Sequence, residues 1–306
     1  MLLATRGQAL FEIAIACDAG PAVRYAAEEL QRYVDRMGLG FAAIRPDTAP
    51  RPRRTVLVGN SRHARSLFPH ATTDGLSHDG YLLHTAAGHL LILGSSPRGT
   101  LYGVYDLLER FGIRWWTPRD ETVPQPATLE TPPLRVRVNP PLAYRGIWYR
   151  NAMDADWQAR MRLSGGTMSP AIMQPRHGET EVYAGHASGH TYHRLVPAEA
   201  YFDRHPEYFS EVSGVRLRHV NQLCCTNPDV PDIAARTLRQ WLAETPGARM
   251  ASVTQNDHGN WCTCRGRCSH ATAPTSPCIF LARPRRRPPR QGIMRCSTSS
   301  IQSLSA

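Results

Sequence analysis

The sequence contains no lysine, so its basic character rests on arginine alone. Its 36 basic residues exceed the 25 acidic ones and give a formal net charge of +11. Part of this excess lies near the C-terminus, where residues 283–290 hold five arginines and no aromatic residue. Nucleic-acid-binding surfaces combine basic side chains with aromatic ones on which bases stack. We therefore expect no nucleic-acid partner.

The sequence also lacks any apolar run near the roughly 18 residues that a membrane-spanning helix needs. Its start does not have the pattern of a secretory signal, because Arg6 and Glu12 interrupt the apolar stretch and no basic segment precedes it. We expect no membrane partner and a cytoplasmic location for the chain as written. A secreted or periplasmic location is expected instead if the N-terminus is incomplete.

The eight cysteines lack the even spacing of a small disulfide framework. Cys17 ends an apolar stretch and is predicted to be a core residue. What the sequence does contain is enough apolar material for a real core, with 42% hydrophobic residues in a chain of 306. This length predicts two domains.

Residues 1–135 alternate between strand and helix patterns. Strands are predicted at 10–17, 41–44, 55–58 and 113–118, helices at 22–37 and 100–111, and a hairpin at 80–94. This order predicts a small α/β sandwich. Arg98 and Gly99 open the second helix, where an anion could bind, but a plain turn with a solvated arginine is the favoured interpretation. Trp115 and Trp116 are interpreted as a core or interface pair rather than a sugar platform.

Three segments of this region have a recognisable pattern, namely AAEELQRYVDRM, VLVGNS and RGTLYGVYDLLE. They resemble the N-terminal domain that precedes the catalytic barrel in bacterial beta-hexosaminidases and alpha-glucuronidases. That domain is an α/β layer without catalytic residues of its own. The resemblance implies an accessory domain at 1–135 and a catalytic barrel after it.

Residues 136–268 alternate between short apolar runs and helical patterns. Strands are predicted at 142–149, 168–173, 222–225 and 250–253, helices at 154–163, 198–205 and 231–242, and a hairpin at 207–216. Repetition of strand, helix and strand favours a parallel β/α arrangement. The segments YFDRHPEYFSEVSGVR, QLCCTNPDV and SVTQNDHGNWCTC resemble a large bacterial family of uncharacterised function. The two resemblances together imply the first half of a TIM-like glycosidase barrel.

The stretch at 250–268 is the candidate active site, because a short apolar strand leads into the residues Thr-Gln-Asn-Asp-His-Gly. In barrels and open α/β sheets, ligands bind at the loops that follow the carboxyl ends of the strands. Asp257 is therefore the predicted catalytic residue, and Asn256 and His258 beside it are predicted to bind substrate. His186 and His190, from a His-rich stretch, complete the predicted substrate-binding set. A polar turn without a site role is the plain alternative.

Glycoside hydrolysis commonly uses two carboxylates, one as the acid and one as the base or nucleophile. The sequence offers no clear second carboxylate beside Asp257. Glu179 and Glu181 lie in the His-rich stretch, and they are interpreted as ordinary solvated side chains. In hexosaminidase-type mechanisms the acetamido group of the substrate takes the place of the nucleophile.

The cysteines near the end of this region suggest a different chemistry. Cys262, Cys264 and Cys268 could hold zinc, with His258 or His270 as a fourth ligand. Structural zinc sites usually show two cysteine pairs, whereas here one residue separates Cys262 from Cys264 and no second pair follows. Inert thiols are the favoured interpretation, and a redox-active pair is the third alternative. We predict no cofactor and no metal, with these three cysteines as weak candidates.

From about residue 269 the sequence has no helix or strand period and is rich in Arg, Pro, Ser and Thr. One interpretation is a disordered basic tail. The favoured one is a frameshifted end, because GC-rich DNA read out of frame often yields such residues and a barrel of some eight strands would stop after about four. A half-barrel exposes strand edges, so residues 136–268 would then be poorly stable.

The predicted fold class is α/β, with a small α/β sandwich accessory domain at 1–135, a partial (β/α) TIM-like barrel at 136–268 and an irregular tail at 269–306. The predicted function is a glycoside hydrolase-like protein, related to alpha-glucuronidases or hexosaminidases, that acts on a polysaccharide or glycoconjugate and is weakly active or inactive if truncated. A non-catalytic carbohydrate-binding protein of the same fold is the alternative. The predicted partner is a carbohydrate, and the sequence leaves the oligomeric state open.

Overall fold

The computed structural model describes residues 1–306 except 51–52, 148, 166–172, 180, 265–278 and 281–306. The chain divides into two compact units, Met1–Val182 and Tyr183–Ala306. The predictions for Cys268, for His270, for the arginine-rich segment 283–290 and for nearly all of the tail lie outside the described residues. So does most of the strand predicted at 168–173.

The first unit contains an α/β sheet domain and a set of shorter helices. Its helices are α1 (Pro21–Arg36), α2 (Arg62–Leu67), α3 (Pro97–Arg110), α4 (Ala155–Arg160) and the 3-10 helices η1 (Arg150–Met153) and η2 (Pro175–His177). Its strands are β1 (Leu2–Thr5), β2 (Gln8–Ala9), β3 (Glu12–Ile15), β4 (Ile44–Pro46), β5 (Thr55–Val58), β6 (Tyr81–Ala86), β7 (His89–Gly94), β8 (Arg114–Thr117), β9 (Asp120–Thr122), β10 (Thr128–Glu130) and β11 (Arg135–Val138).

The central sheet has the strand order β11-β6-β7-β5-β3-β4. Strands β4, β3, β5 and β7 run parallel, whereas β6 is antiparallel to both β7 and β11. Successive residues of a strand point to opposite faces. Val56 and Val58 enter the main core, and Leu57 between them enters a smaller core on the other face. Two buried faces explain why the central strands are continuous apolar runs in the sequence.

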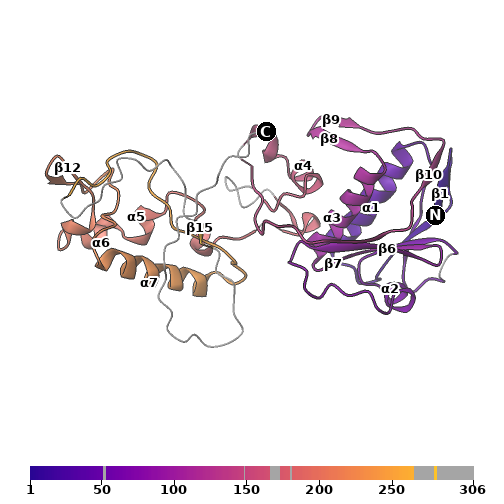
Figure 1. Ribbon diagram of the computed structural model, residues 1–306, viewed down its shortest axis with the longest axis horizontal. Helices are drawn as coiled ribbons and strands as arrows, with labels where there is room; N and C mark the ends of the chain where they lie inside the picture. Colours follow the sequence, from indigo (N-terminus) through magenta and orange to yellow (C-terminus); the bar gives the residue numbers. More distant parts are fainter. Residues whose placement is uncertain (51–52, 148, 166–172, 180, 265–278, 281–306) are drawn as a thin grey trace. The chain divides into compact units, whose positions relative to one another are not determined.

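Helices α1 and α3 cover one face of this sheet, and the short α2 covers the other (Figure 1). Helix α1 buries Ala26, Leu30 and Tyr33, which recur at helical spacing. Helix α3 begins at the N-cap Ser96, whose hydroxyl accepts the N–H of Gly99 at 3.1 Å. The mixed α/β class predicted from the sequence is confirmed in this unit.

The structure corrects one prediction about a residue of the first unit and agrees in part with another. Cys17 is exposed rather than in the core, because β3 ends at Ile15 and the chain turns there toward α1. The adjacent tryptophans have different environments, since Trp115 is buried and Trp116 is 60% exposed. They are consecutive residues of β8, so their side chains leave the strand on opposite sides.

The chain that follows the predicted boundary at residue 135 continues to build the first unit. Asp154 is the N-cap of α4 as predicted, with its Oδ1 accepting the N–H of Trp157 at 2.8 Å. The indole of Trp157 is buried and donates to the carbonyl of Trp115 at 3.2 Å. The strand predicted at 142–149 is not formed in its described residues, because the main chain there bonds to Ser164 instead of to a neighbouring strand.

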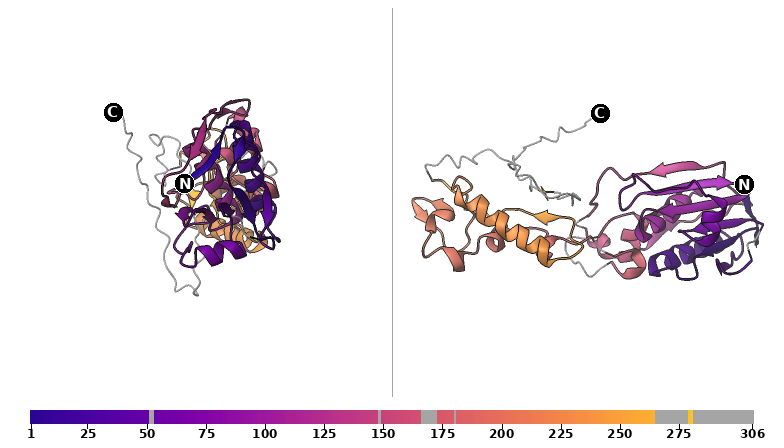
Figure 2. Two further views of the ribbon diagram at one scale, coloured as in Figure 1. Left: turned by 90° about the vertical axis from the view of Figure 1, so that its right-hand side faces the viewer. Right: turned by 90° about the horizontal axis from the view of Figure 1, so that it is seen from below.

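The second unit is built mainly from helices and short strands. Its elements are η3 (Ala184–His186), α5 (Tyr192–Leu195), α6 (Ala198–Tyr201), η4 (Pro206–Tyr208), β12 (Glu211–Val212), β13 (Val215–Arg216), α7 (Asp229–Glu244), β14 (Ala251–Ser252) and β15 (Ile279–Phe280). Helix α7, the long orange helix in Figure 2, buries Val230, Ile233 and Trp241 in a core shared with Phe209 and Leu223.

Strand pairing in the second unit differs from a run of parallel strands. The hairpin predicted around Ser213 is formed by β12 and β13. Strand β14 pairs antiparallel with β15. In the described part of this unit the parallel pairing is a single bridge between Tyr183 and Met250. The partial TIM-like barrel is therefore not confirmed and stays a prediction.

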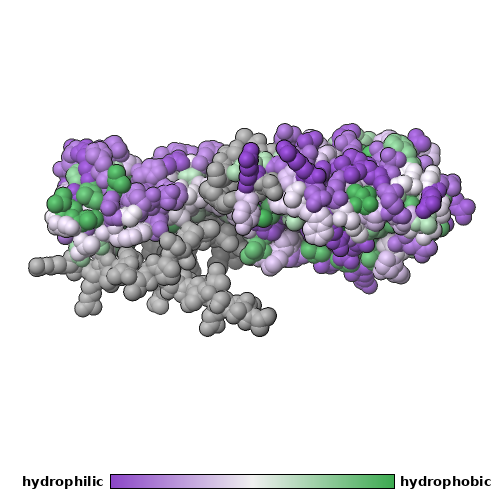
Figure 3. Space-filling model, turned by 90° about the horizontal axis from the view of Figure 1, so that it is seen from above, coloured by the Kyte–Doolittle hydropathy of each residue, from purple (hydrophilic) through white to green (hydrophobic). Residues whose placement is uncertain are grey.

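The face of the molecule in Figure 3 is mostly hydrophilic. The large apolar side chains with high exposure, among them Phe41, Trp116, Tyr149 and Val220, are scattered along the sequence. Single exposed apolar residues are normal on a folded protein and mark no partner. Among the described residues, no helix combines the length and the apolar character that crossing a membrane requires.

Candidate functional site

The loop that follows β14, residues 254–260, contains the predicted catalytic residue and is called the Asp257 loop. Its first residue is tied to a buried threonine on another segment. The N–H of Thr254 donates to Oγ1 of Thr191 at 2.9 Å, and the N–H of Thr191 donates to the carbonyl of Thr254 at 3.0 Å. Both side chains are buried. The start of the loop is thereby fixed to the segment that precedes α5.

A buried glutamine holds the middle of the Asp257 loop. Gln222 is 1% exposed. Its Oε1 accepts the N–H of Asn256 at 3.0 Å, and its Nε2 donates to the carbonyls of Asn256 at 2.9 Å and His258 at 2.8 Å. One side-chain amide thus satisfies main-chain groups on both sides of Asp257. The main chain that carries the carboxylate is therefore held in one conformation.

Asn256 was predicted to bind substrate, and the structure directs its side chain into the protein. The residue is 7% exposed. Its Nδ2 donates to the carbonyl of Asn221 at 2.7 Å, and its Oδ1 accepts the main-chain N–H of His193 at 3.1 Å. These contacts make Asn256 a positioning residue for the loop.

Asp257 itself points to solvent, with its side chain 87% exposed. Nε2 of His190 lies 3.8 Å from its Oδ2, and Nδ1 of His190 lies 3.1 Å from the carbonyl of Gln255. When Nδ1 donates to that carbonyl, Nε2 of the neutral ring is an acceptor that faces another acceptor. Both side chains are exposed, and at this separation no hydrogen bond joins them. A ligand at the surface of the loop can therefore reach the carboxylate and the imidazole together.

The two other predicted substrate-binding histidines differ in their placement. His258 lies on the Asp257 loop, and its Nδ1 is 2.9 Å from the carbonyl of Gly259. His186 ends the short helix η3, where its N–H donates to the carbonyl of Tyr183 at 3.0 Å. The structure thus brings Asp257, Asn256, His190 and His258 onto or beside one loop, whereas His186 bonds to Tyr183, the residue that precedes η3.

Three residues that form the loop's supports were not in the predicted site. These are Thr191, His193 and Gln222, which reach it from segments distant in the sequence. His193 belongs to the Gly-His-Thr-Tyr-His run, which gave a local signal. Nothing in the pattern around Gln222 indicates its partners, because they depend on tertiary contacts.

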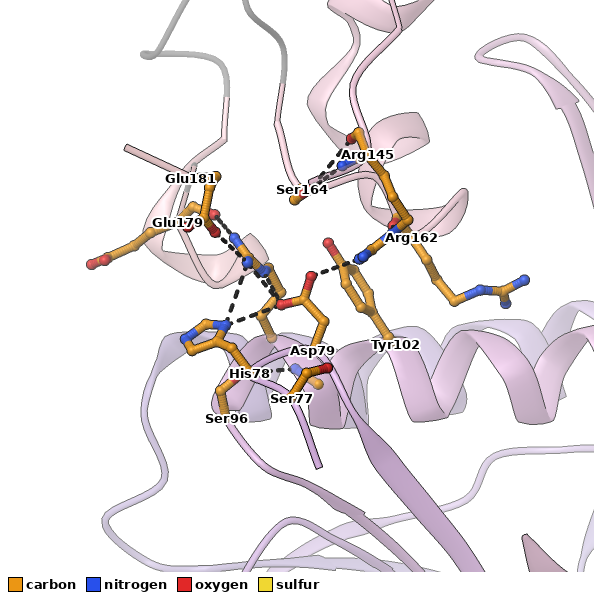
Figure 4. Close-up of polar contacts among 12 residues, drawn as sticks. Ser77, His78, Asp79, Ser96, Tyr102, Arg145, Arg162, Ser164, Glu179 and Glu181 are labelled. Atoms are coloured by element: carbon orange, nitrogen blue, oxygen red, sulfur yellow. Dashed lines mark hydrogen bonds and ion pairs between the residues drawn. The ribbon is translucent and has the colours of Figure 1, made fainter. Parts of the chain in front are cut away.

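A second polar cluster lies in the first unit and is drawn in Figure 4. Arg98 is 1% exposed, and its Nε donates to Oδ1 of Asp79 at 2.8 Å. Nη2 of Arg98 donates to Oε2 of Glu181 at 2.9 Å, and Nη2 of Arg145 donates to Oδ2 of Asp79 at 2.6 Å. These four residues are called the Arg98 cluster. Their two positive and two negative charges balance within it.

The Arg98 cluster corrects two predictions, because Arg98 and Glu181 were expected to be solvated and both are buried. Burial by itself raises the pKa of Asp79. The hydrogen bond from His78 and the contacts from the two arginines outweigh burial and hold that pKa well below its usual range. Gly178 packs so closely that a Cβ there would lie 2.4 Å from the Cβ of Arg98. The charges of the cluster pair with one another instead of facing a ligand, and removal of one partner would leave an uncompensated buried charge.

Asp156, in α4, has a related structural role. Its Oδ1 lies 2.7 Å from Nε2 of the buried His177 and accepts the hydroxyl of Tyr25 at 3.1 Å. The hydrogen bond from His177 is the largest cause that lowers the pKa of Asp156, from 3.8 to about 2. The pairing connects α1, α4 and η2 within the first unit.

We expect the change Asp156→Asn to lower the free energy of unfolding near neutral pH by about 1 kcal/mol, a value reduced for solvent screening because the carboxylate is one-third exposed. The folded-state pKa is depressed, so this stabilisation is present above about pH 4 and is lost as the pH falls toward 2. Urea unfolding at several pH values measures it, with the exposed Asp18→Asn as control. Equal pH dependence in wild type and Asp156→Asn would contradict the prediction.

Cysteine side chains from two distant segments meet in the second unit. The sulfur atoms of Cys224, Cys262 and Cys264 all lie within 4.8 Å of one another, and those of Cys224 and Cys264 are 3.6 Å apart. We call this group the cysteine cluster. Cys224 is the member that the sequence analysis missed. It lies within the strand predicted at 222–225, and tertiary contacts bring it beside the residues that follow the Asp257 loop.

Comparison with known families identifies two regions of the chain. A family model described as "Domain of unknown function (DUF4838)" matches residues 115–277, and one described as "Glycosyl hydrolase family 67 N-terminus" matches residues 4–107. No curated protein matches the sequence. The second match confirms that the N-terminal region is related to glycosidases, as the resemblance had implied.

Three solved structures show low similarity to this chain. A family GH115 4-O-methyl-alpha-glucuronidase with specificity for decorated arabinogalactans is 18% identical, with a TM-score of 0.40 over 55% of this chain and 26% of that one. A GH138 enzyme targeting pectin rhamnogalacturonan II is 14% identical, with a TM-score of 0.30 over 44% of this chain and 12% of that one. A chitobiase of Flavobacterium johnsoniae is 14% identical, with a TM-score of 0.35 over 83% of this chain and 42% of that one. This chain spans less than half the length of each of these proteins.

Proposed function

We propose that this chain, which belongs to the DUF4838 family through residues 115–277, is a glycoside hydrolase in which Asp257 gives or accepts the catalytic proton. The glycosidase-related region at 4–107 supports a carbohydrate substrate. The single observation that carries the proposal is the exposed carboxylate of Asp257 on a loop whose main chain is hydrogen-bonded to the buried side chain of Gln222. Rigid support under an accessible acid is the arrangement that acid–base catalysis needs.

Within this proposal, the supporting residues set the direction of the acid. Gln222 and Asn256 hold the loop, and His190 lies on the exposed side next to the carboxylate. A proton on Asp257 can pass to the glycosidic oxygen as the leaving sugar departs, and Asp257 is then left as its carboxylate.

Asp257 is the single acidic residue of its loop, and this favours a substrate that brings its own nucleophile. A sugar with a 2-acetamido group does so, because its carbonyl oxygen can attack the anomeric carbon while an enzyme carboxylate assists. We therefore propose an N-acetylhexosamine glycoside within a polysaccharide or glycoconjugate as the substrate. The TIM-like barrel predicted for residues 136–268 is part of the same proposal, since barrel enzymes place their acids on the loops after strands.

The test compares wild type with Asp257→Asn on 4-nitrophenyl N-acetylhexosaminides and 4-nitrophenyl glucuronides. We expect turnover of the acetamido substrates and a loss of about a hundredfold in kcat for Asp257→Asn, the effect of removing a positioned acid. Asp232→Asn, at an exposed position of α7, is the matched control and should keep full activity.

Other outcomes of this assay would exclude parts of the proposal. Full activity in Asp257→Asn would remove this residue from the mechanism. Activity on glucuronides alone would exclude the acetamido route. Saturable binding of the sugars without turnover would favour the alternative, a non-catalytic carbohydrate-binding protein.

A further inference from the structure

We propose that the cysteine cluster of Cys224, Cys262 and Cys264 binds one zinc ion through its sulfur atoms. The inference rests on the geometry and surroundings of the sulfurs, so it stands independently of the proposed activity. It also goes beyond the expectation from the sequence, which grouped Cys262 and Cys264 with a different third cysteine and favoured no metal.

The spacing of the sulfur atoms fits three corners of a tetrahedron. Zinc binds thiolate sulfur at about 2.3 Å in tetrahedral sites, which places neighbouring sulfurs about 3.8 Å apart. The sulfurs of Cys224 and Cys264 are 3.6 Å apart, and all three lie within 4.8 Å of one another. A disulfide bond would be about 2.05 Å long, so Cys224 and Cys264 are not joined to each other.

Hydrogen-bond donors surround the sulfurs and fit a negatively charged group. The N–H of Glu211 and Nη1 of Arg216 lie 3.4 and 3.6 Å from the sulfur of Cys262. The hydroxyl of Thr226 lies 3.4 Å from the sulfur of Cys224. Zinc with three thiolates carries one net negative charge, and the guanidinium of Arg216 lies beside it while also pairing with Oε2 of Glu211 at 3.3 Å. Donors of this kind orient metal-binding ligands and tune their affinity.

Burial distinguishes this group from surface thiols. Cys224 and Cys262 are 3% and 4% exposed, whereas Cys264 is half-buried and lies toward solvent. A fourth ligand, water or another donor, can therefore reach the ion from the side of Cys264. Zinc binds well to several thiolates and has neither redox chemistry nor a preferred geometry of its own to satisfy.

A zinc ion here would have a consequence for the neighbouring site. Cys262 and Cys264 follow directly after the Asp257 loop, and Cys224 lies two residues after Gln222. The ion would join the same two segments that Gln222 already joins by hydrogen bonds. It would therefore fix the end of the loop, as Thr191 fixes its start.

The experiment measures metal on the full chain, purified under reducing conditions without chelators. We expect one zinc per chain by mass spectrometry of the metals, and its recovery when zinc is returned after chelation. Cobalt in place of zinc should give the charge-transfer absorption of thiolate ligands. Cys224→Ser, Cys262→Ser and Cys264→Ser should each weaken zinc binding at least about a hundredfold, because each removes a ligand.

Two controls separate loss of a ligand from loss of structure. Cys225→Ser changes the exposed neighbour of Cys224 and should keep one zinc per chain. Arg216→Met keeps all three thiols and should weaken zinc binding about tenfold through the lost charge. Wild type that takes up no zinc, cobalt spectra without thiolate absorption, serine variants that still hold one zinc, or a preference for copper or iron would each overturn the proposal. A disulfide among the three cysteines, seen as a loss of two hydrogens by mass, would do the same.

Discussion

Replacing Arg98 by methionine is expected to lower the free energy of unfolding of the first unit by about 3–5 kcal/mol, the cost of breaking a buried ion pair by removing one partner. Arg98 is 1% exposed and contacts both Asp79 and Glu181. Without it, two buried carboxylates remain with Arg145 as their single nearby cation in the Arg98 cluster. Methionine keeps much of the side-chain volume, so the loss reports charge rather than a cavity.

The measurement is urea unfolding combined with hydrogen exchange of the amides in β6 and β7, which report on the first unit alone. Arg110→Met is the matched control, because Arg110 lies on the same helix α3 but pairs with Asp106 at the surface. That change should cost less than about 1 kcal/mol. Adding Glu181→Gln to Arg98→Met should recover part of the loss, since it removes one of the unpaired charges. If Arg98→Met lowered the free energy of unfolding no more than Arg110→Met does, the prediction for the Arg98 cluster would be wrong.

Replacing Gln222 by leucine is expected to destabilise the second unit by about 2–4 kcal/mol, because buried main-chain groups lose their partners. The amide of Gln222 serves the N–H and carbonyl of Asn256 and the carbonyl of His258. Leucine fills a similar volume but offers no donor or acceptor. We expect the Asp257 loop to lose its fixed conformation before the core around α7 unfolds.

Hydrogen exchange of the Asn256 amide measures this effect directly, since that N–H donates to Gln222. Exchange should become at least tenfold faster in Gln222→Leu. Gln240→Leu is the control, because Gln240 is exposed on α7 and bonds to Glu244 at the surface. Unchanged protection of Asn256 in Gln222→Leu would mean that other contacts hold the loop.

The sequence predicted the regular elements of the first unit because their periodicity is local. Helices α1 and α3 repeat apolar residues at helical spacing, and β5 matches its predicted range of 55–58. The partners of Arg98 could not be predicted, because Asp79 and Glu181 reach it from distant segments. From sequence alone, an arginine at a helix start is expected to be exposed, because its tertiary contacts are not visible.

For the candidate site, too, the sequence predicted the local segment but not its distant partners. Asp257 and its neighbours stand next to one another in the sequence, and the apolar run before them predicted the strand β14. Gln222 and Cys224 were not predictable as parts of this region, because their contacts depend on how a second segment lies beside the loop. Local patterns located the loop, and tertiary contacts decided which side chains hold it.

The Arg98 cluster has a consequence for dividing this protein into pieces. Two of its members, Asp79 and Arg98, precede residue 135, and the other two, Arg145 and Glu181, follow it. A fragment that stops at 135 would therefore keep the Asp79–Arg98 pair and discard the second partner of each residue. The first compact unit, residues 1–182, contains all four charged residues. A fragment of this protein should therefore end after Glu181 and not at residue 135.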